Sequence, residues 1–147
     1  MESNKIHGLI ADYLKKHNVL TLATVTHDHK PLAHTVEYVS ENATVYFTSS
    51  KKTRKIQNIL KNPFVAYTVD EDYPNWMTIQ GVQMEGTATV LSAKEEIDRA
   101  AALYIGKFPF VAQFPPNPEM VFIRIAPTRG FYLDYTQGFT HQDAVVF

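Results

Sequence analysis

Cysteine is absent from the 147 residues of this chain. Its absence excludes disulfide bonds, thiol nucleophiles, iron–sulfur clusters and zinc sites built from thiolates. It is compatible with a reducing compartment, and we expect a cytoplasmic protein. Long apolar runs are also missing: none reaches the roughly 18 residues of a membrane span, and residues 1–5 lack the apolar core of a signal peptide.

An excess of charge of either sign is missing as well, since the formal net charge is −1. A whole-surface attraction to nucleic acid is therefore not expected. Glycine occurs only six times, and neither a glycine-rich phosphate loop nor the G-x-S-x-G turn of serine hydrolases is present. The chain therefore carries the signature of neither a P-loop protein nor an α/β-hydrolase.

Nine Phe and eight Tyr residues favour a β-rich core. Turn residues and apolar alternation predict strands at 19–26, 31–39, 44–49, 64–69, 76–91, 120–126 and 130–134. Helical spacing predicts one helix that ends near Asn18, one over 52–61, and one from a Ser92 cap to Gly106. Because short turns join the first strands, these strands should be antiparallel. We expect one domain over residues 1–147, of mainly β (α+β) class: an antiparallel barrel of six to seven strands with peripheral helices.

The segment 48–55 (TSSKKTRK) combines hydroxyl and cationic side chains where a strand ends and a helix begins. A helix N-terminus has unpaired N–H groups and the positive end of the helix dipole, so it favours anions. Arg54 is able to grip two oxygens of a phosphate, and Lys52 or Lys55 adds point charge. A solvated basic face is the ordinary explanation of such a run, and a phosphate site is the alternative that would explain cations in the first turn of a helix.

Histidines near the first turn raise the question of a metal site. His27, His29 and His34 have spacing compatible with two ligands on one hairpin, but no carboxylate or histidine elsewhere is tied to them by a recognisable spacing. Polar turn residues are the ordinary explanation, so we expect no metal. Trp76 follows an acidic loop and is interpreted as a core or interface anchor, with stacking on a flavin as the alternative.

Several motifs, taken in order, resemble the pyridoxamine 5′-phosphate oxidase-like split β-barrels, which bind FMN. They are residues 19–24 (VLTLAT), 33–38 (AHTVEY), 45–48 (VYFT), 53–55 (TRK), 62–66 (NPFVA) and 81–86 (GVQMEG). Residues 108–109 (FP) and 134–139 (DYTQGF) resemble a subfamily of small bacterial proteins. The resemblance covers nearly the whole chain and implies a split β-barrel that forms a homodimer with FMN in the cleft between subunits.

The resemblance also implies roles for individual residues. Arg54 and Lys55 would hold the FMN phosphate, and Thr48 would add a hydroxyl. The second strand would run beside the flavin ring and ribityl chain, Gln83 would approach from the other side, and the C-terminal segment would reach the partner's flavin. The residues so assigned to cofactor binding are His34, Thr35, Val36, Glu37, Tyr38, Phe47, Thr48, Ser49, Lys52, Thr53, Arg54, Lys55, Gln83, Gln137, Gly138 and Phe139.

The implied activity is that of an FMN-dependent oxidoreductase acting on a small organic substrate or electron donor. No side chain stands out as a general acid or base, so no catalytic residue is assigned. Oxidation of pyridoxamine phosphate is not expected, because His34 stands where the oxidase has a basic residue and the oxidase's C-terminal Arg/His pattern is not visible. A non-catalytic flavin carrier or sensor is a second interpretation. A haem-binding split barrel with His141 as the axial ligand is a third.

Overall fold

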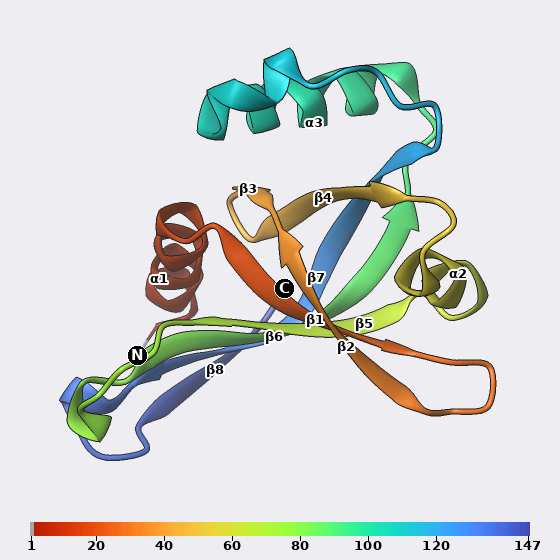
Figure 1. Ribbon diagram of the computed structural model, residues 1–147. Helices are drawn as coiled ribbons and strands as arrows, with labels where there is room; N and C mark the ends of the chain where they lie inside the picture. Colours follow the sequence, from red (N-terminus) through yellow and green to blue (C-terminus); the bar gives the residue numbers. More distant parts are fainter. Residues whose placement is uncertain (1) are drawn as a thin grey trace.

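Eight antiparallel strands form one curled sheet in the computed structural model, which describes residues 2–147 (Figure 1). The strands are β1 Val19–Val25, β2 Pro31–Glu37, β3 Val39–Glu41, β4 Thr44–Ser50, β5 Phe64–Asp70, β6 Gln80–Val90, β7 Met120–Asp134 and β8 Gln142–Val146. Their order is β2-β1-β5-β6-β7-β4-β3, and β8 pairs with β7. The helices are α1 Ser3–Lys16, α2 Arg54–Lys61 and α3 Lys94–Lys107, with short 3-10 helices η1 Trp76–Thr78, η2 Pro109–Gln113 and η3 Tyr135–Gln137. This half-barrel with peripheral helices confirms the predicted fold class.

The prediction of two strands at 120–126 and 130–134, joined as a hairpin across Pro127, is wrong, because β7 is one continuous strand. On one side, β7 pairs with β4 only as far as Ile125, and with β8 only from Arg129 onward. Pro127 lies in the gap between these two partners, so its missing N–H costs no ladder hydrogen bond on that side. On the other side, Glu85 of β6 pairs with Arg129 and Gly86 pairs with Pro127, so Thr128 is the extra residue of a bulge in β7. The closing hairpin is instead β7–β8.

Three other boundaries also differ from the prediction. The long strand begins at Gln80 rather than Trp76, since Asn75 accepts a hydrogen bond from the Met77 N–H and starts a 3-10 turn. Ser92 does not cap α3, whose N-cap is Ala93 with no side-chain hydrogen bond. The second strand stops at Glu37, and the chain then pairs with β4 as the short strand β3.

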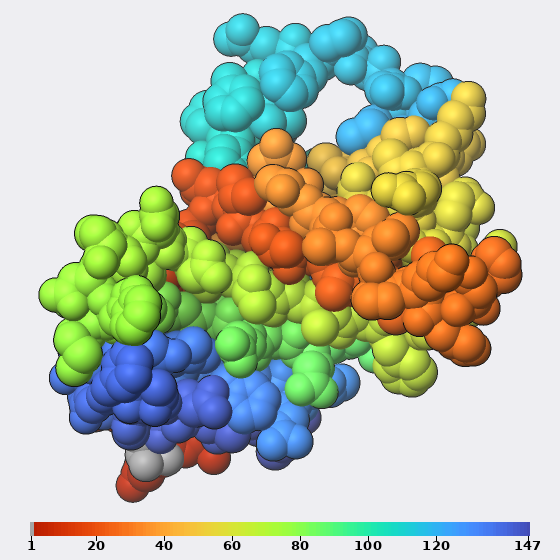
Figure 2. Space-filling view, turned by 60° about the horizontal axis from the view of Figure 1, so that its bottom comes forward, coloured from red at the N-terminus to blue at the C-terminus, as the bar shows by residue number. Residues whose placement is uncertain are grey.

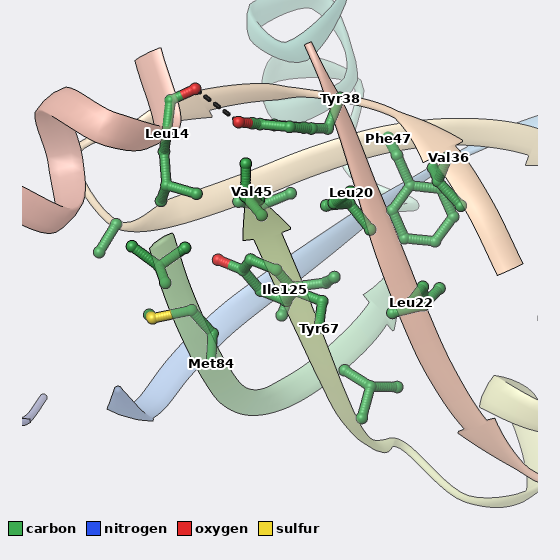
Figure 3. Packing of buried hydrophobic residues seen from close by; sticks show 14 of the residues in the cluster. Leu14, Leu20, Leu22, Val36, Tyr38, Val45, Phe47, Tyr67, Met84 and Ile125 are labelled. Atoms are coloured by element: carbon green, nitrogen blue, oxygen red, sulfur yellow. Dashed lines mark hydrogen bonds between the residues drawn. The ribbon is translucent and has the colours of Figure 1, made fainter. Parts of the chain in front are cut away.

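The core lies inside the curl of the sheet, where α1 closes one side (Figures 1 and 3). Its fully buried side chains come from α1, β1, β4, β6 and β7, and include Leu14, Leu22, Phe47, Met84 and Ile125. A second, smaller cluster lies under α3 and contains Val39, Tyr46, Leu91, Ala100 and Tyr104. Removing apolar surface from water stabilises the folded state by about 25 cal/mol per Å². Burial of these side chains therefore favours the curled sheet that encloses them.

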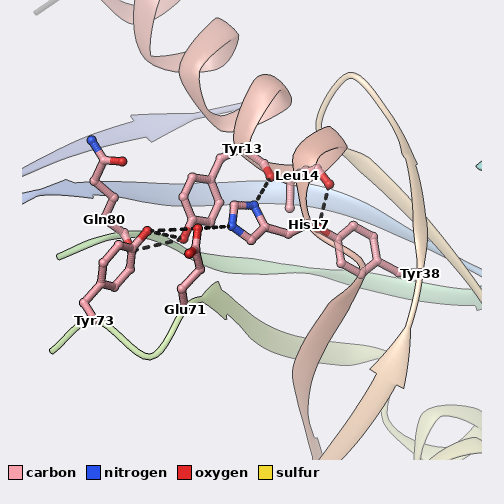
Figure 4. A network of polar contacts seen from close by, with 7 residues as sticks. All are labelled: Tyr13, Leu14, His17, Tyr38, Glu71, Tyr73 and Gln80. Carbon is pink, nitrogen blue, oxygen red and sulfur yellow. Dashed lines mark hydrogen bonds and ion pairs between the residues drawn. The ribbon is translucent and has the colours of Figure 1, made fainter. Parts of the chain in front are cut away.

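A polar network fastens the acidic loop after β5 to the end of α1 (Figure 4). His17 Nε2 lies 2.8 Å from a Glu71 carboxylate oxygen, and the Tyr13 and Tyr73 hydroxyls are 3.0 Å apart. The Tyr13 hydroxyl also donates to the Gln80 carbonyl at 3.2 Å. These bonds fix the loop that leads into η1 and β6.

The segment formed by α3 and η2, called the strap below, lies over β3 and β4 at one end of the molecule and packs on them through Ala100 and Tyr104. Figure 2 shows it arching away from the residues of β4 and α2, with an opening between them. Lys107 anchors the end of α3: its ammonium donates to the carbonyls of His17 and Tyr38 and lies 4.3 Å from the centre of the Tyr38 ring. Among the described residues, no helix combines the length and apolar character that a membrane span requires.

Candidate functional site

The residues of the predicted anion site lie in the turn between β4 and α2, and α2 begins at Arg54 rather than Lys52. Thr53 occupies the N-cap position with an extended backbone, but its hydroxyl donates to the Ser50 carbonyl at 2.9 Å instead of capping the helix. The Ser49 hydroxyl lies 3.2 Å from that of Thr53 and helps to hold the turn. The first-turn N–H groups of α2 are thus left without a side-chain acceptor, and no acidic residue lies in that turn.

The cations of this turn are not equivalent. Lys52 pairs with Glu119, with 2.7 Å between Nζ and Oε1. Within residues 2–147, Arg54 and Lys55 have no ion-pair partner. Two free cations beside an uncapped helix N-terminus are unfavourable for the helix on their own, and an anion would remove the penalty.

His34 of β2 lies close enough to Arg54 and Lys55 for their positive charges to shift the pKa of its imidazole. Burial first, and then the positive charges of Lys55 and Arg54, lower the pKa of the His34 imidazole below its usual value. Its Nε2 is 2.9 Å from the hydroxyl of Thr24, which also accepts a hydrogen bond of 3.0 Å from the Asn58 amide. His34, Arg54 and Lys55 therefore share one positively charged region.

Thr24 and Asn58 were missed by the sequence prediction. Thr24 is completely buried, and Asn58 lies on α2 one turn after Arg54. The spacing of four residues between Arg54 and Asn58 was the available signal, since such residues share a helix face. The place of Thr24 between β2 and α2 depends on the tertiary contacts and has no local signature.

The remaining assigned residues of β2 and β4 divide between surface and core. Thr35 and Glu37 are exposed on β2, an edge strand whose outer backbone groups have no partner strand. In contrast, Val36, Tyr38 and Phe47 are buried in the core, and the Tyr38 hydroxyl donates to the Leu14 carbonyl at 2.6 Å. The side chains of these three residues face away from any surface ligand, so only their backbone could meet a cofactor.

Thr35 and Gln83, both assigned to cofactor binding, lie on one row of paired residues across the outer face of the sheet. The register aligns Thr35, Thr21, Thr68, Gln83 and Phe131 on β2, β1, β5, β6 and β7. Gln83 is three strands from Thr35, about 14 Å at the usual strand spacing. A shallow depression of about 280 Å³ lies on this row, and small side chains such as Ala23 and Ala66 line it with Gln83.

Gln137, Gly138 and Phe139 lie at a different end of the molecule from α2. Figure 1 shows the tip that follows β7 at the left of the view and α2 at the right. Phe139 stacks on Trp76 with 6.4 Å between ring centres, and the two side chains remain 54% and 68% exposed. Trp76 is therefore not a core residue. Within one chain this tip does not reach Arg54, so a shared site would need a second copy.

The histidines proposed as metal or haem ligands are placed as follows. His27 and His29 lie in the turn between β1 and β2, and no group of three or more metal-ligating side chains occurs within residues 2–147. His141 precedes β8, and its Nε2 lies 3.0 Å from an Asp143 carboxylate oxygen. This pairing occupies the nitrogen that an axial ligand would use.

A sequence profile described as pyridoxamine 5′-phosphate oxidase matches residues 6–134. This chain belongs to that family. The match spans every strand from β1 to β7 together with the basic turn, so the resemblance in the motifs is confirmed at the level of the family. No curated protein sequence matches the chain.

Three solved structures with the same fold illustrate how differently such proteins are described. A conserved hypothetical protein, Rv2991, from Mycobacterium tuberculosis is 23% identical, with a TM-score of 0.77 over 97% of this chain and 91% of that one. The haem storage protein HutZ from Vibrio cholerae is 16% identical, with a TM-score of 0.69 over 99% and 95%. A haem-binding protein from Mycobacterium smegmatis is 16% identical, with a TM-score of 0.78 over 93% of this chain; the chain spans 57% of that protein's length. At these identities the similarity shows the fold alone.

Proposed function

We propose that this protein is a homodimeric FMN-binding flavoprotein that acts as an oxidoreductase on a small organic molecule. The observation that carries the proposal is the pair of unpartnered cations, Arg54 and Lys55, at the uncapped N-terminus of α2. A phosphate monoester has roughly two negative charges and three acceptor oxygens, which suit a guanidinium, an ammonium and free N–H groups. Membership of the pyridoxamine 5′-phosphate oxidase family makes FMN the phosphate ester of choice.

Other described residues fit the rest of the cofactor. The exposed edge of β2, with Thr35 and Glu37, offers unpaired backbone groups to a ring and its polar chain. The Gln137–Phe139 tip lies at a different end of the molecule from α2, so the tip of a second copy would be needed to complete the site. A homodimer with the cofactor between its subunits is thus part of the proposal.

FMN, when bound, supplies hydride and single-electron transfer, and the protein supplies binding and orientation. Arg54 and Lys55 would hold the phosphate, and the hydrogen bond between the buried Thr24 and the half-buried His34 would keep the imidazole oriented beside them. His34 is the one ionisable side chain of the region whose pKa is lowered, so it stays neutral near pH 7 and is able to accept a proton.

The proposal is tested by comparing FMN with riboflavin, which lacks the phosphate. In the Arg54→Ala, Lys55→Ala double variant, FMN affinity should fall by at least about a hundredfold, because charge-assisted bonds are worth about 1.5–3 kcal/mol each. Riboflavin affinity should change little. Lys61→Ala, at the other end of the same helix, is the matched control and should bind FMN normally. Equal losses for both flavins in calorimetry would refute the phosphate assignment.

Haem binding is the second candidate, favoured by the names of two structural neighbours. It requires an available axial ligand, and His141 would have to leave Asp143 to become one. Adding haem to the purified protein and recording the Soret band separates the candidates: a ligated Soret band lost in His141→Ala supports haem. A flavin spectrum bleached by a reduced nicotinamide supports an enzyme, and a bound flavin that no donor reduces supports a carrier.

A further inference from the structure

An aromatic cavity lies beneath the strap formed by α3 and η2, on the opposite side of β4 from the core. Its volume is about 340 Å³, within the range of small-molecule sites. Apolar side chains dominate the lining, with Phe108, Phe110, Phe114 and Met120 among them. The opening between the strap and the residues of β4 and α2 in Figure 2 lies in the same region.

The aromatic rings of this cavity form a continuous series. Successive ring centres are 6.1 Å apart for Tyr104 and Phe108, 6.0 Å for Phe108 and Phe110, and 5.8 Å for Phe110 and Phe114, each pair tilted. Phe110 and Phe114 are nevertheless 59% and 62% exposed. Clustered exposed aromatic residues on a short loop indicate a binding surface, because folding alone gains little from them.

One charged residue lines this cavity. Glu37, exposed at the end of β2, is the single charged residue of the lining, and its carboxylate has no hydrogen-bond or ion-pair partner in residues 2–147. The Tyr104 hydroxyl is neutral, since burial raises its pKa, and it donates to the Glu37 carbonyl at 3.1 Å. The ammonium of Lys107 is held by the His17 and Tyr38 carbonyls and does not line the cavity.

We infer that this cavity binds an apolar organic cation, such as an aromatic molecule that carries a quaternary ammonium group. Aromatic rings attract cations through their electron-rich faces, and the attraction grows when water is excluded. The Glu37 carboxylate adds complementary charge and disfavours anions, while the phenylalanine side chains cover the apolar part. The Lys107 ammonium already lies 5.5 Å from the centre of the Phe108 ring, so the exposed rings of Phe110 and Phe114 are the ones left for a bound cation.

The cavity adjoins the anion site. Thr48 lines it and lies two residues before Ser50, and Met120 of the lining follows Glu119, the partner of Lys52. If FMN binds as proposed, the cation would lie near the cofactor and would represent the substrate class. That second step rests on the proposed function, whereas binding of the cation does not.

The test uses the full-length protein free of flavin, so that its result is independent of FMN. Three probes with one benzyl group each are titrated by NMR: benzyltrimethylammonium, the neutral benzyl tert-butyl ether, and phenylacetate. We expect the cation to bind at least about fivefold more tightly than the ether and to shift the amide signals of residues 108–114, with no binding of phenylacetate.

Variants decide whether the cavity is responsible. Glu37→Gln should remove the preference for the cation over the ether, and Phe114→Leu should weaken both by about threefold or more. Glu95→Gln, an exposed carboxylate on α3, is the matched control and should retain the preference. Equal affinity for cation and ether, a preference that survives Glu37→Gln, or no binding of any probe up to about 10 mM would overturn the inference. The test of FMN binding with the Arg54 and Lys55 variants does not depend on any of these outcomes, so the two proposals can fail separately.

Discussion

His34 and Thr24 are joined by a hydrogen bond of 2.9 Å between the imidazole Nε2 and the threonine hydroxyl. Thr24 in turn accepts from Asn58 of α2, the helix that begins with Arg54 and Lys55. The imidazole is therefore fixed in position relative to the two free cations. It can report on whatever binds to them.

The first prediction is that FMN raises the pKa of His34. In the free protein that pKa is lowered first by burial and then by Lys55 and Arg54. A phosphate dianion between the two cations would offset their repulsion, so the protonated imidazole would become less unfavourable. Imidazole signals in an NMR titration, assigned with His34→Asn, should move to a higher midpoint with FMN and much less with riboflavin.

Linkage gives the same prediction a second readout. Because FMN raises the pKa of His34, binding must take up protons in the interval between the free and bound values, and affinity must rise as the pH falls through it. Calorimetry in two buffers of different ionisation enthalpy measures this uptake. Identical midpoints with and without FMN would show that the phosphate does not lie beside Arg54 and Lys55.

A second prediction concerns the two ends of the molecule. If the tip of one subunit completes the site of the other, Phe139→Ala should weaken FMN binding although the residue is remote from Arg54 in its own chain. Mixing this variant with the Arg54→Ala, Lys55→Ala variant should restore tight binding, because one site of each mixed dimer has both parts intact. At equal concentrations and free exchange, about one site in four would recover. No recovery, with subunit exchange confirmed by light scattering and mass spectrometry, would argue against a shared site.

Pyridoxamine phosphate should be a poor substrate or none. A second phosphate near the flavin needs a second cationic pair, and Arg124 and Arg129 are the nearest candidates by sequence. Arg124 is committed to Glu96, with 2.7 and 2.6 Å to its two oxygens, and Arg129 lies over the Phe131 ring at 5.0 Å. A peroxide-release assay on FMN-loaded protein should stay far below the usual enzymatic rate of about 1 per second. Normal turnover that is lost in Arg129→Ala would restore the oxidase assignment.

The close packing of Gly86 against the bulge of β7 makes a prediction about stability. A Cβ atom at Gly86 would lie 2.6 Å from the Ala126 carbonyl oxygen and 2.9 Å from Ile125 Cγ2, and backbone cannot yield cheaply. Gly86→Ala should lower the free energy of unfolding by about 1–3 kcal/mol. Gly8→Ala, in α1 with nothing within 4 Å, should raise it by about 0.5–1 kcal/mol. Urea unfolding followed by circular dichroism measures both, and a Gly86→Ala protein as stable as wild type would contradict the packing of β6 against β7.

Local chemistry explains which structural predictions succeeded. Strands β1, β4 and β5 and the helix α2 were expected within a few residues, because alternation, helical spacing and Pro63 act over short distances. The continuous strand β7 was not expected, since Pro127 reads as a turn when considered alone. Only the gap between the partners β4 and β8 makes an extended proline acceptable there.

The candidate site shows the same division. The sequence by itself determined that hydroxyl groups and four cations follow β4 at the start of a helix, because these residues are consecutive. The tertiary contacts select among them: Glu119, distant in sequence, pairs with Lys52, while Lys51, Arg54 and Lys55 have no ion-pair partner within residues 2–147, and the last two lie near His34. Tertiary structure also decided that Val36, Tyr38 and Phe47 face the core and that the Gln137–Phe139 tip lies far from α2, because burial and the path of a curled sheet depend on the whole chain.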